Sequence, residues 1–266
     1  MPEWPDVEIF KRYLDATSLH QKIQMVTVLS QKILKDTSPE SLRQALEGHC
    51  FESSIHYGKY LFSEIDNRER LVMHFGMTGS LKYCRQGDAN GSHDRIVFAF
   101  NNGYKLVYVC QRLFGRVGLV KSVDGFLKSY GQGPDAMRID IDRFRQIFEK
   151  ARGRVKPTLM NQKIIAGIGN IYSDEILFQA GVNPAAFCNI LTDADVKKLY
   201  HNTKKVLKRA VERKADPWKL PQSYLLPHRS RGETCPRCHS KIQTRKIAGR
   251  TAFYCPECQK APRNIL

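Results

Sequence analysis

The sequence contains no run of about 18 apolar residues, the length that a membrane-spanning helix requires. Its first residues, Met-Pro-Glu-Trp-Pro-Asp, also lack the apolar core of a secretory signal. No cluster of acidic residues has a pattern suited to Mg²⁺, which argues against a metal-dependent nuclease. We therefore expect a cytoplasmic protein that makes no contact with a membrane.

Acidic residues are few in proportion to basic ones, 26 Asp and Glu against 43 Lys and Arg, for a formal net charge of +17. Solubility alone requires far less charge than this. Each phosphate that a basic side chain neutralises releases counterions, so the charge favours a nucleic-acid partner and a nucleoid-associated location. The alternative is a basic protein that binds acidic molecules without selectivity.

Disulfides are not expected from the eight cysteines, because the compartment is reducing. Four of them, Cys50, Cys84, Cys110 and Cys188, are scattered, and we interpret them as buried thiols.

The other four cysteines form two Cys-x-x-Cys pairs, Cys235 with Cys238 and Cys255 with Cys258, separated by sixteen residues. This spacing closes a tetrahedral Cys₄ site for one structural Zn²⁺, with no coordination position left for water. The alternative is two unrelated pairs. Basic residues and a β-like run from Thr251 to Tyr254 lie between the pairs, a pattern typical of a β-hairpin finger.

The chain changes character along its length. Short β-rich stretches with turn residues between them favour a β-sandwich or barrel in residues 1–125. A linker at Gly131 to Pro134 precedes helical patterns at Ile139 to Ala151, Thr158 to Ala180 and Asp193 to Arg213. We predict a multidomain α+β protein with domains at 1–125, 126–220 and 221–266.

Pro2 follows Met1, and methionine is commonly removed before a small residue such as proline. The exposed secondary amine can attack an aldehydic sugar carbon and form a Schiff base. Glu3 lies beside it as a possible acid or base. Taken alone, these two residues are weak evidence, because many chains begin Met-Pro-Glu, and a disordered start of the chain is then the favoured alternative.

Together the motifs resemble the formamidopyrimidine-DNA glycosylase / endonuclease VIII family nearly from end to end. In chain order they are Pro2 to Glu8 (PEWPDVE), Gly58 to Leu61 (GKYL), His74 to Gly79 (HFGMTG), Arg112 to Gly115 (RLFG), Ala166 to Glu175 (AGIGNIYSDE) with Ala180 to Pro184 (AGVNP), and Gly249 to Gln259 (GRTAFYCPECQ). The resemblance implies an N-terminal β-sandwich, a helical domain with a helix–two-turn–helix and a C-terminal zinc β-hairpin finger.

The same resemblance implies a bifunctional DNA glycosylase and AP lyase of base excision repair. In such an enzyme the Pro2 amine attacks C1′ of a damaged nucleotide flipped out of double-stranded DNA, Glu3 assists proton transfer, and β,δ-elimination cuts the strand. Lys59 and Arg250 would complete the catalytic set by gripping phosphates, together with His74 and Asn170.

Met77, Arg112 and Phe114 would fill the space left by the flipped nucleotide. For these residues the alternatives are surface charges at Lys59 and Arg250, a structural histidine at His74, a plain tight turn before Asn170, and strand-end packing for the three void-filling residues. Asp174 and Glu175 we interpret as structural residues of a helix.

The chain also departs from the family pattern. The signature carries Trp4 and Asp6, and Cys110-Gln111 precedes Arg112 where an aspartate is usual. The stretch from Arg213 to Glu233 is short, leaving no room for the loop that closes over 8-oxoguanine. We hypothesise weak excision of 8-oxoguanine and better excision of formamidopyrimidines, hydantoins, oxidised pyrimidines or abasic sites.

We expect a monomer. Two rivals remain open, a lesion-binding protein without catalysis on the same scaffold and a zinc-ribbon nucleic-acid module of unrelated fold. The second leaves the first 180 residues unexplained.

Overall fold

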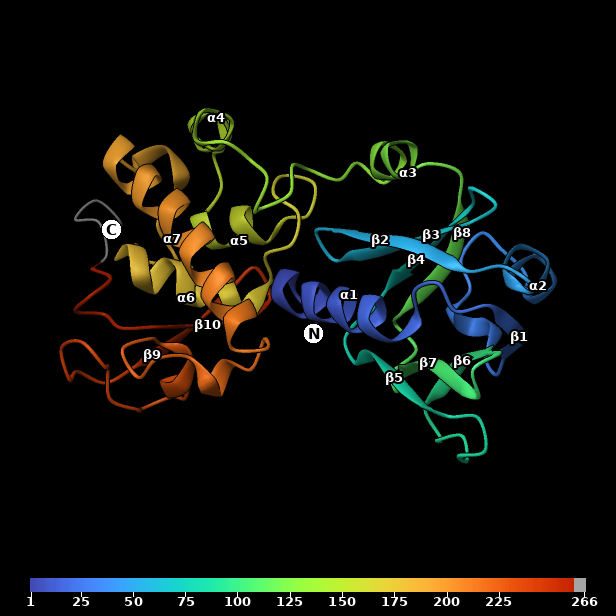
Figure 1. The fold of residues 1–266 in the computed structure, drawn as a ribbon. Helices are drawn as coiled ribbons and strands as arrows, with labels where there is room; N and C mark the ends of the chain where they lie inside the picture. The colour runs from blue at the N-terminus through green and yellow to red at the C-terminus, as the bar shows by residue number, and fades with distance from the viewer. Residues whose placement is uncertain (261–266) are drawn as a thin grey trace. The chain divides into compact units, whose positions relative to one another are not determined.

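A computed structural model describes residues 1–260 of the chain. It divides into two compact units (Figure 1). The first unit comprises Met1–Pro2 and Asp6–Gly131, and the second comprises Glu3–Pro5 and the chain from Gln132 onward. The last six residues of the predicted 221–266 domain lie outside the described residues.

The first unit is a β-sandwich of two antiparallel sheets, with strand orders β1-β6-β7-β5 and β2-β3-β4-β8. Its strands are β1 Ile23–Val28, β2 Phe51–Tyr57, β3 Tyr60–Ile65, β4 Arg70–His74, β5 Gly79–Arg85, β6 Asp94–Phe100, β7 Tyr104–Cys110 and β8 Arg116–Val120. The turn at residues 101–103 joins β6 to β7, and Gly103 there has a φ of +83°.

Both sheets contribute to one core. Phe51 of one sheet contacts Phe98 of the other, with ring centroids 5.9 Å apart, and both side chains are fully buried. The helices of this unit are α1 Trp4–Ser18, α2 Pro39–Leu46 and α3 Val123–Ser129, with a short 3₁₀ turn η1 at Gln31–Ile33. From Asp6 onward α1 belongs to the first unit, and its Val7 and Leu14 enter the same core.

The second unit is helical and ends in a hairpin. Its elements are α4 Ile141–Lys150, α5 Val155–Met160, α6 Asn170–Ala180, η2 Cys188–Ile190, α7 Asp193–Glu212, η3 Pro217–Lys219, η4 Leu226–His228, β9 Gln243–Ile247 and β10 Arg250–Tyr254. Strands β9 and β10 pair antiparallel. The predicted multidomain α+β architecture is therefore confirmed.

The predicted helical stretch from Thr158 to Ala180 is divided in the structure. It contains two helices, α5 and α6, separated by residues 161–169. Gly167 has a φ of +110°, which a right-handed helix does not permit, and Gly169 is the extended residue that precedes α6. The apolar spacing continues across the break because the intervening Ile165 and Ile168 are also buried.

The scattered cysteines differ from expectation in part. Cys110 and Cys188 are buried as predicted, whereas the expectation is wrong for Cys50 and Cys84, which are half-buried. Both lie at or near sheet edges, Cys50 just before β2 and Cys84 near the end of β5. In the described part of the chain, no helix is long and apolar enough to span a membrane.

Candidate functional site

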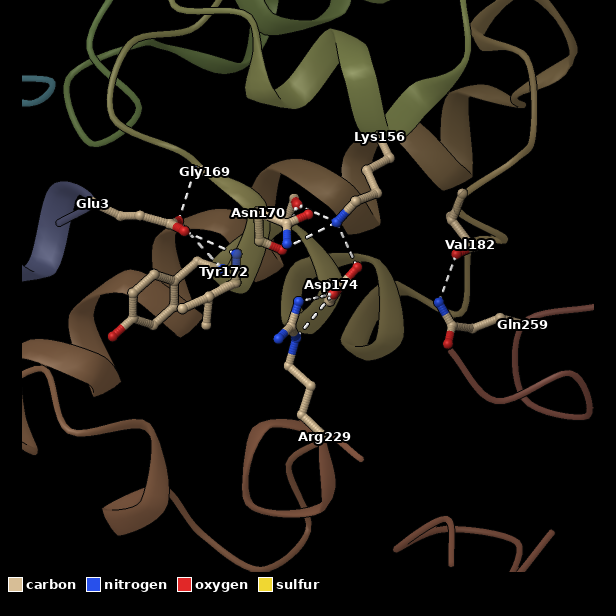
Figure 2. A network of polar contacts seen from close by, with 11 residues as sticks. Glu3, Lys156, Gly169, Asn170, Tyr172, Asp174, Val182, Arg229 and Gln259 are labelled. Carbon is tan, nitrogen blue, oxygen red and sulfur yellow. Dashed lines mark hydrogen bonds and ion pairs between the residues drawn. The ribbon is translucent and has the colours of Figure 1, made fainter. Parts of the chain in front are cut away.

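The carboxyl group of Glu3 is bound at the N-terminus of α6. Its Oε2 accepts hydrogen bonds from the backbone N–H of Gly169, at 2.6 Å, and of Tyr172, at 3.3 Å. Its Oε1 accepts one from the N–H of Ile171, at 2.8 Å (Figure 2). The first amides of a helix lack partners within the helix and carry partial positive charge, so they bind an anionic group well. Glu3 is 1% exposed, and the site fixes it firmly.

The Glu3 carboxylate occupies backbone amides that a helix N-terminus could otherwise present to a phosphate. Of its three donors, Gly169 belongs to the turn before Asn170, and Ile171 and Tyr172 belong to the first turn of α6. A Cβ on Gly169 would lie 2.4 Å from the Glu3 carboxyl carbon, so only glycine allows the carboxylate to approach this closely.

Trp4 attaches the same N-terminal segment to the second unit. Its backbone N–H donates to the Gly167 carbonyl at 3.0 Å, and its indole Nε1 donates to the Asp135 carboxylate at 3.0 and 3.1 Å. The indole also packs against Gly167, where a Cβ would lie 2.7 Å from it. Pro2, the predicted nucleophile, is half-buried and is joined covalently to the fixed Glu3.

Asn170 is the first residue of α6 and lies next to the amides that bind Glu3. Its backbone carbonyl accepts a hydrogen bond from Lys156 Nζ at 3.0 Å. Its side-chain Oδ1 is buried and has no hydrogen-bond partner among the described residues. The structure thus brings two predicted residues, Glu3 and Asn170, to one helix end.

Behind this helix end lies a buried ionic network that the sequence did not reveal. Lys156 Nζ donates to Asp174 Oδ1 at 2.6 Å and to Ser173 Oγ at 2.9 Å, and the side chains of Lys156 and Asp174 are 1% and 0% exposed. Asp174 Oδ2 accepts two bonds from Arg229, at 3.0 and 2.8 Å (Figure 2). The guanidinium of Arg229 in turn lies over the Phe253 ring of β10, 4.4 Å from its centroid.

Burial perturbs the charges of this region. Desolvation lowers the pKa of Lys156 and raises the pKa of Asp174, and their mutual attraction opposes both shifts. Desolvation also raises the pKa of the neighbouring Glu175 to about 7, although the backbone N–H groups of Leu225 and Leu226 donate to it. The sequence signal for this network was a single lysine, Lys156, inside a short apolar helical stretch.

The first unit positions two further predicted residues. Lys59 lies in the turn between β2 and β3, after Gly58, whose φ is +55°, and is 7% exposed. His74 ends β4, opposite Tyr60 in the sheet register, and its ring lies 4.9 Å from the Tyr60 ring. Burial lowers the pKa of His74 to about 4, and the nearby charges of Lys59 and Arg116 act in the same direction.

His74 is therefore neutral at physiological pH. Its Nδ1 faces the backbone N–H of Gly76 at 3.2 Å and must accept that hydrogen bond. The proton of the neutral ring is then on Nε2, which can donate to an anionic oxygen. A neutral donor of this kind suits a phosphate contact that does not depend on pH near neutrality.

The three predicted void-filling residues come from two loops in direct backbone contact. A Cβ on Gly76 would lie 2.4 Å from the Phe114 carbonyl carbon, and Arg112 N–H donates to Thr78 Oγ1 at 3.1 Å. Phe114 is 53% exposed, so it does not pack in the strand-end core, and the Arg112 guanidinium lies 5.4 Å from its ring centroid. Met77 is half-buried beside them. Leu113 between the two has a φ of +55°, a strained conformation for a branched residue.

The four cysteines Cys235, Cys238, Cys255 and Cys258 form one cluster with ligand atoms within 4.8 Å of one another. Sulfur–sulfur distances of 3.8 Å for Cys235–Cys258 and 3.4 Å for Cys238–Cys255 fit a tetrahedral ion, whose Zn–S bonds place the sulfurs about 3.8 Å apart. The cluster is compatible with one structural Zn²⁺, and four thiolate ligands would leave no position for a catalytic water.

The zinc hairpin presents Arg250 at its tip. The turn between β9 and β10 consists of Ala248 and Gly249, with φ of +46° and +74°, and Arg250 is the exposed residue that follows. The base of the hairpin is fixed by Gln259, whose side-chain Nε2 donates to the Val182 carbonyl (Figure 2). Its Oε1 accepts a hydrogen bond from the N–H of Cys255.

Family models match the chain in three consecutive parts. They are the formamidopyrimidine-DNA glycosylase N-terminal domain over residues 1–117, the formamidopyrimidine-DNA glycosylase H2TH domain over residues 130–221, and the zinc finger found in FPG and IleRS over residues 232–261. Together they cover most of the chain.

Relatives and solved structures agree with these matches. Formamidopyrimidine-DNA glycosylases of Pelotomaculum thermopropionicum and Lactococcus lactis are each 31% identical over 98% of this chain and 99% and 100% of their own length. The Lactococcus lactis Fpg bound to DNA containing N7-benzyl-Fapy-dG is 29% identical, with a TM-score of 0.88 over 98% of this chain and all of that one. MutM bound to DNA containing carbocyclic 8-oxo-G superimposes with a TM-score of 0.89 at 29% identity, over 98% of this chain and all of the other.

Proposed function

The chain belongs to the formamidopyrimidine-DNA glycosylase family and is a DNA glycosylase of base excision repair, and from this premise we propose how its own residues perform the reaction. Removal of Met1 frees the secondary amine of Pro2. The amine attacks C1′ of the flipped nucleotide as the bond to the damaged base breaks. Opening of the sugar ring then breaks the C1′–O4′ bond, with a proton delivered to O4′, and leaves an iminium that joins protein and sugar. Loss of a proton from C2′ then breaks the 3′ C–O bond, and a second elimination breaks the 5′ C–O bond.

The observation that carries this proposal is the binding of Glu3 by the N–H groups of Gly169, Ile171 and Tyr172. Because Glu3 is fixed, the amine of the adjacent Pro2 is held in place and is not part of a mobile chain end, which preorganises the attack. The same carboxylate is one peptide unit away from the reacting nitrogen and serves the proton transfers of ring opening and hydrolysis.

The remaining site residues bind the distorted duplex in this proposal. Lys59, His74, Asn170 and Arg250 contact phosphates around the lesion. Met77, Phe114 and Arg112 replace the flipped nucleotide, the first two by stacking and the arginine by donating to the unpaired base. The exposed Phe114 beside Arg112 supports this role.

Borohydride trapping tests the amine chemistry. Zinc-replete protein, with loss of Met1 verified by intact mass, is mixed with a duplex holding an abasic site and reduced. We expect a covalent adduct. The matched control is the same chain with a cleavable N-terminal extension, which should give no adduct until a protease regenerates Pro2. Tight binding of the duplex without any adduct would instead support the lesion-binding protein that lacks catalysis.

We further propose that 8-oxoguanine is a poor substrate. In the stretch from Arg213 to Glu233, the apolar residues after Trp218 pack in the core, since Leu220, Tyr224, Leu225 and Leu226 are all buried. Few residues remain to extend as a loop over a flipped base. Single-turnover rates on 8-oxoguanine and on a formamidopyrimidine in the same duplex test this, and comparable rates would contradict it.

The finer partner and location assignments are also proposals. We propose that damaged double-stranded DNA is bound by a monomer in the cytoplasm, associated with the nucleoid. The net charge of +17 supports the association with DNA. Light scattering of the protein alone and of its DNA complex measures the stoichiometry, and a mass of two chains per duplex would overturn the monomer.

A further inference from the structure

Helix α7 (orange in Figure 1) carries four exposed basic side chains on one side. Lys198, His201, Lys205 and Lys208 follow one another at intervals of three, four and three residues, which places them on one side of the helix, and all are exposed. The opposite side carries the apolar residues that pack into the core of the second unit, Val196, Leu199, Val206, Leu207 and Ala210.

Basic residues outnumber acidic ones on this face, where Asp195 lies three residues before Lys198 and Glu212 four residues after Lys208. The ion pairs of α7 involve other residues, Lys197 with Asp193 and Arg209 with Glu212. Lys198, Lys205 and Lys208 have no acidic partner among residues 1–260. Like charges three residues apart on a helix, such as Lys205 and Lys208, destabilise it slightly. A face that only needed to be soluble would mix both signs, so this one indicates an anionic partner.

An exposed aromatic residue lies at the C-terminal end of the same helix. The chain reverses after Glu212, where the N–H of Ala215 donates to the Ala210 carbonyl at 2.8 Å and that of Asp216 to the Arg213 carbonyl at 3.1 Å. Trp218 follows, 68% exposed, with Lys219 beside it.

Trp218 stands out within its own segment. The other large apolar residues that follow it, from Leu220 to Leu226, are buried, and Trp218 is the most exposed large apolar side chain of the described residues. An indole left in water at the end of a basic stripe has no packing role.

Basic side chains that follow a phosphate backbone, combined with an aromatic face for stacking, are the two components of single-stranded DNA sites. In an intact duplex the base faces are already stacked, so a duplex could use the lysines but not Trp218. A membrane surface fits poorly, because the apolar side of α7 is buried.

We propose that the face formed by Lys198, His201, Lys205 and Lys208, together with Trp218, binds a single-stranded stretch of DNA. This surface is separate in its residues from those assigned to the lesion. It would hold an unpaired segment next to damage, such as a gap or an overhang, and so extends the substrates of the enzyme beyond fully paired duplexes.

Fluorescence titration provides the first test. The emission of Trp218 is obtained as the difference between the protein and its Trp218→Phe variant, and the probe is a 12-nucleotide oligothymidine, with a stable DNA hairpin of equal charge as comparison. We expect oligothymidine to quench Trp218, and the hairpin not to. Trp218→Ala should weaken oligothymidine binding about fivefold or more, because stacking contributes at least about 1 kcal/mol per base, while Trp218→Phe retains most of it.

The lysines are tested by the triple change Lys198→Gln, Lys205→Gln, Lys208→Gln. Each lost phosphate contact reduces the slope of log K against log salt by about 0.7 for single strands, so the slope should fall by about two. The matched control removes the same charge elsewhere, at the exposed residues Lys22, Lys32 and Lys128 of the first unit, and should leave the slope within about 0.5.

Single-turnover cleavage of a saturating abasic duplex separates this proposal from the proposed function. The α7 triple variant should cleave at a rate within twofold of the unmodified protein. Equal quenching by oligothymidine and hairpin, or equal salt slopes for the two triple variants, would overturn the single-strand site and leave the lesion chemistry untouched.

Discussion

Replacing Lys156 by methionine tests the buried ionic network that supports the Glu3-binding turn. The change keeps the length of the side chain and removes the charge. Lys156 Nζ loses its bonds to Asp174, Ser173 and the Asn170 carbonyl, at 2.6, 2.9 and 3.0 Å. Asp174, with a side chain that is 0% exposed, is then left with Arg229 alone.

Removing one partner of a buried pair costs about 3–5 kcal/mol, because the other charge stays buried without compensation. A domain is stable by only about 5–15 kcal/mol, so this is a large fraction of the stability of the second unit. Asp174→Asn in the same background should recover part of the loss, since it removes the uncompensated carboxylate.

Urea unfolding followed by tryptophan emission measures this effect in the second unit alone. The chain has two tryptophans, Trp4 and Trp218, and both belong to that unit. The matched control is Lys197→Met, which breaks the exposed pair with Asp193 and should cost less than about 1 kcal/mol. Equal, small losses in Lys156→Met and Lys197→Met would refute the reasoning that the network is buried and charged.

Three further predictions follow from the site. Because burial lowers the pKa of His74 from 6.5 to about 4, the unfolded chain binds a proton between these pH values that the folded chain does not. The first unit should therefore lose up to about 3 kcal/mol of stability as pH falls from 6.5 to 4. Calorimetry should show that the stability of His74→Asn depends less on pH over this range. Gly169→Ala should displace the Glu3 carboxylate and slow single-turnover strand cleavage about tenfold or more, whereas Gly87→Ala, where a Cβ meets nothing within 4 Å, should leave the rate unchanged. After chelation of the single Zn²⁺, the amides of residues 243–254 should lose their protection from hydrogen exchange while the amides of α7 stay protected. Unchanged protection of the hairpin would count against a structural metal.

The sequence was sufficient for features that depend on local patterns. The spacing of Cys235, Cys238, Cys255 and Cys258 predicted the zinc cluster, and the alternation of apolar residues placed the strands of the sandwich. The motifs that resemble a known family supplied the domain order, which the family models confirm.

The sequence was insufficient wherever the partner of a side chain lies far away along the chain. Nothing near Glu3 indicates that its carboxylate binds Gly169, and nothing near Asp174 indicates that Lys156 and Arg229 share it. The break between α5 and α6 is not marked by the apolar pattern, because buried isoleucines in the intervening turn continue the apolar spacing of a helix. Hydrophobic periodicity reports burial and does not distinguish a helix from a packed turn.

The pairing of Glu3 with the turn at Gly169 also has a consequence in time. The two residues are 166 positions apart, so at about 5–20 residues per second a ribosome makes the turn roughly 8–33 seconds after the glutamate. Throughout that interval the N-terminal segment has no binding site for its carboxylate and stays accessible to processing enzymes. Met1 can therefore be removed and the Pro2 amine exposed early. The nascent chain acquires the rigid arrangement around Glu3 only after the helical unit has folded.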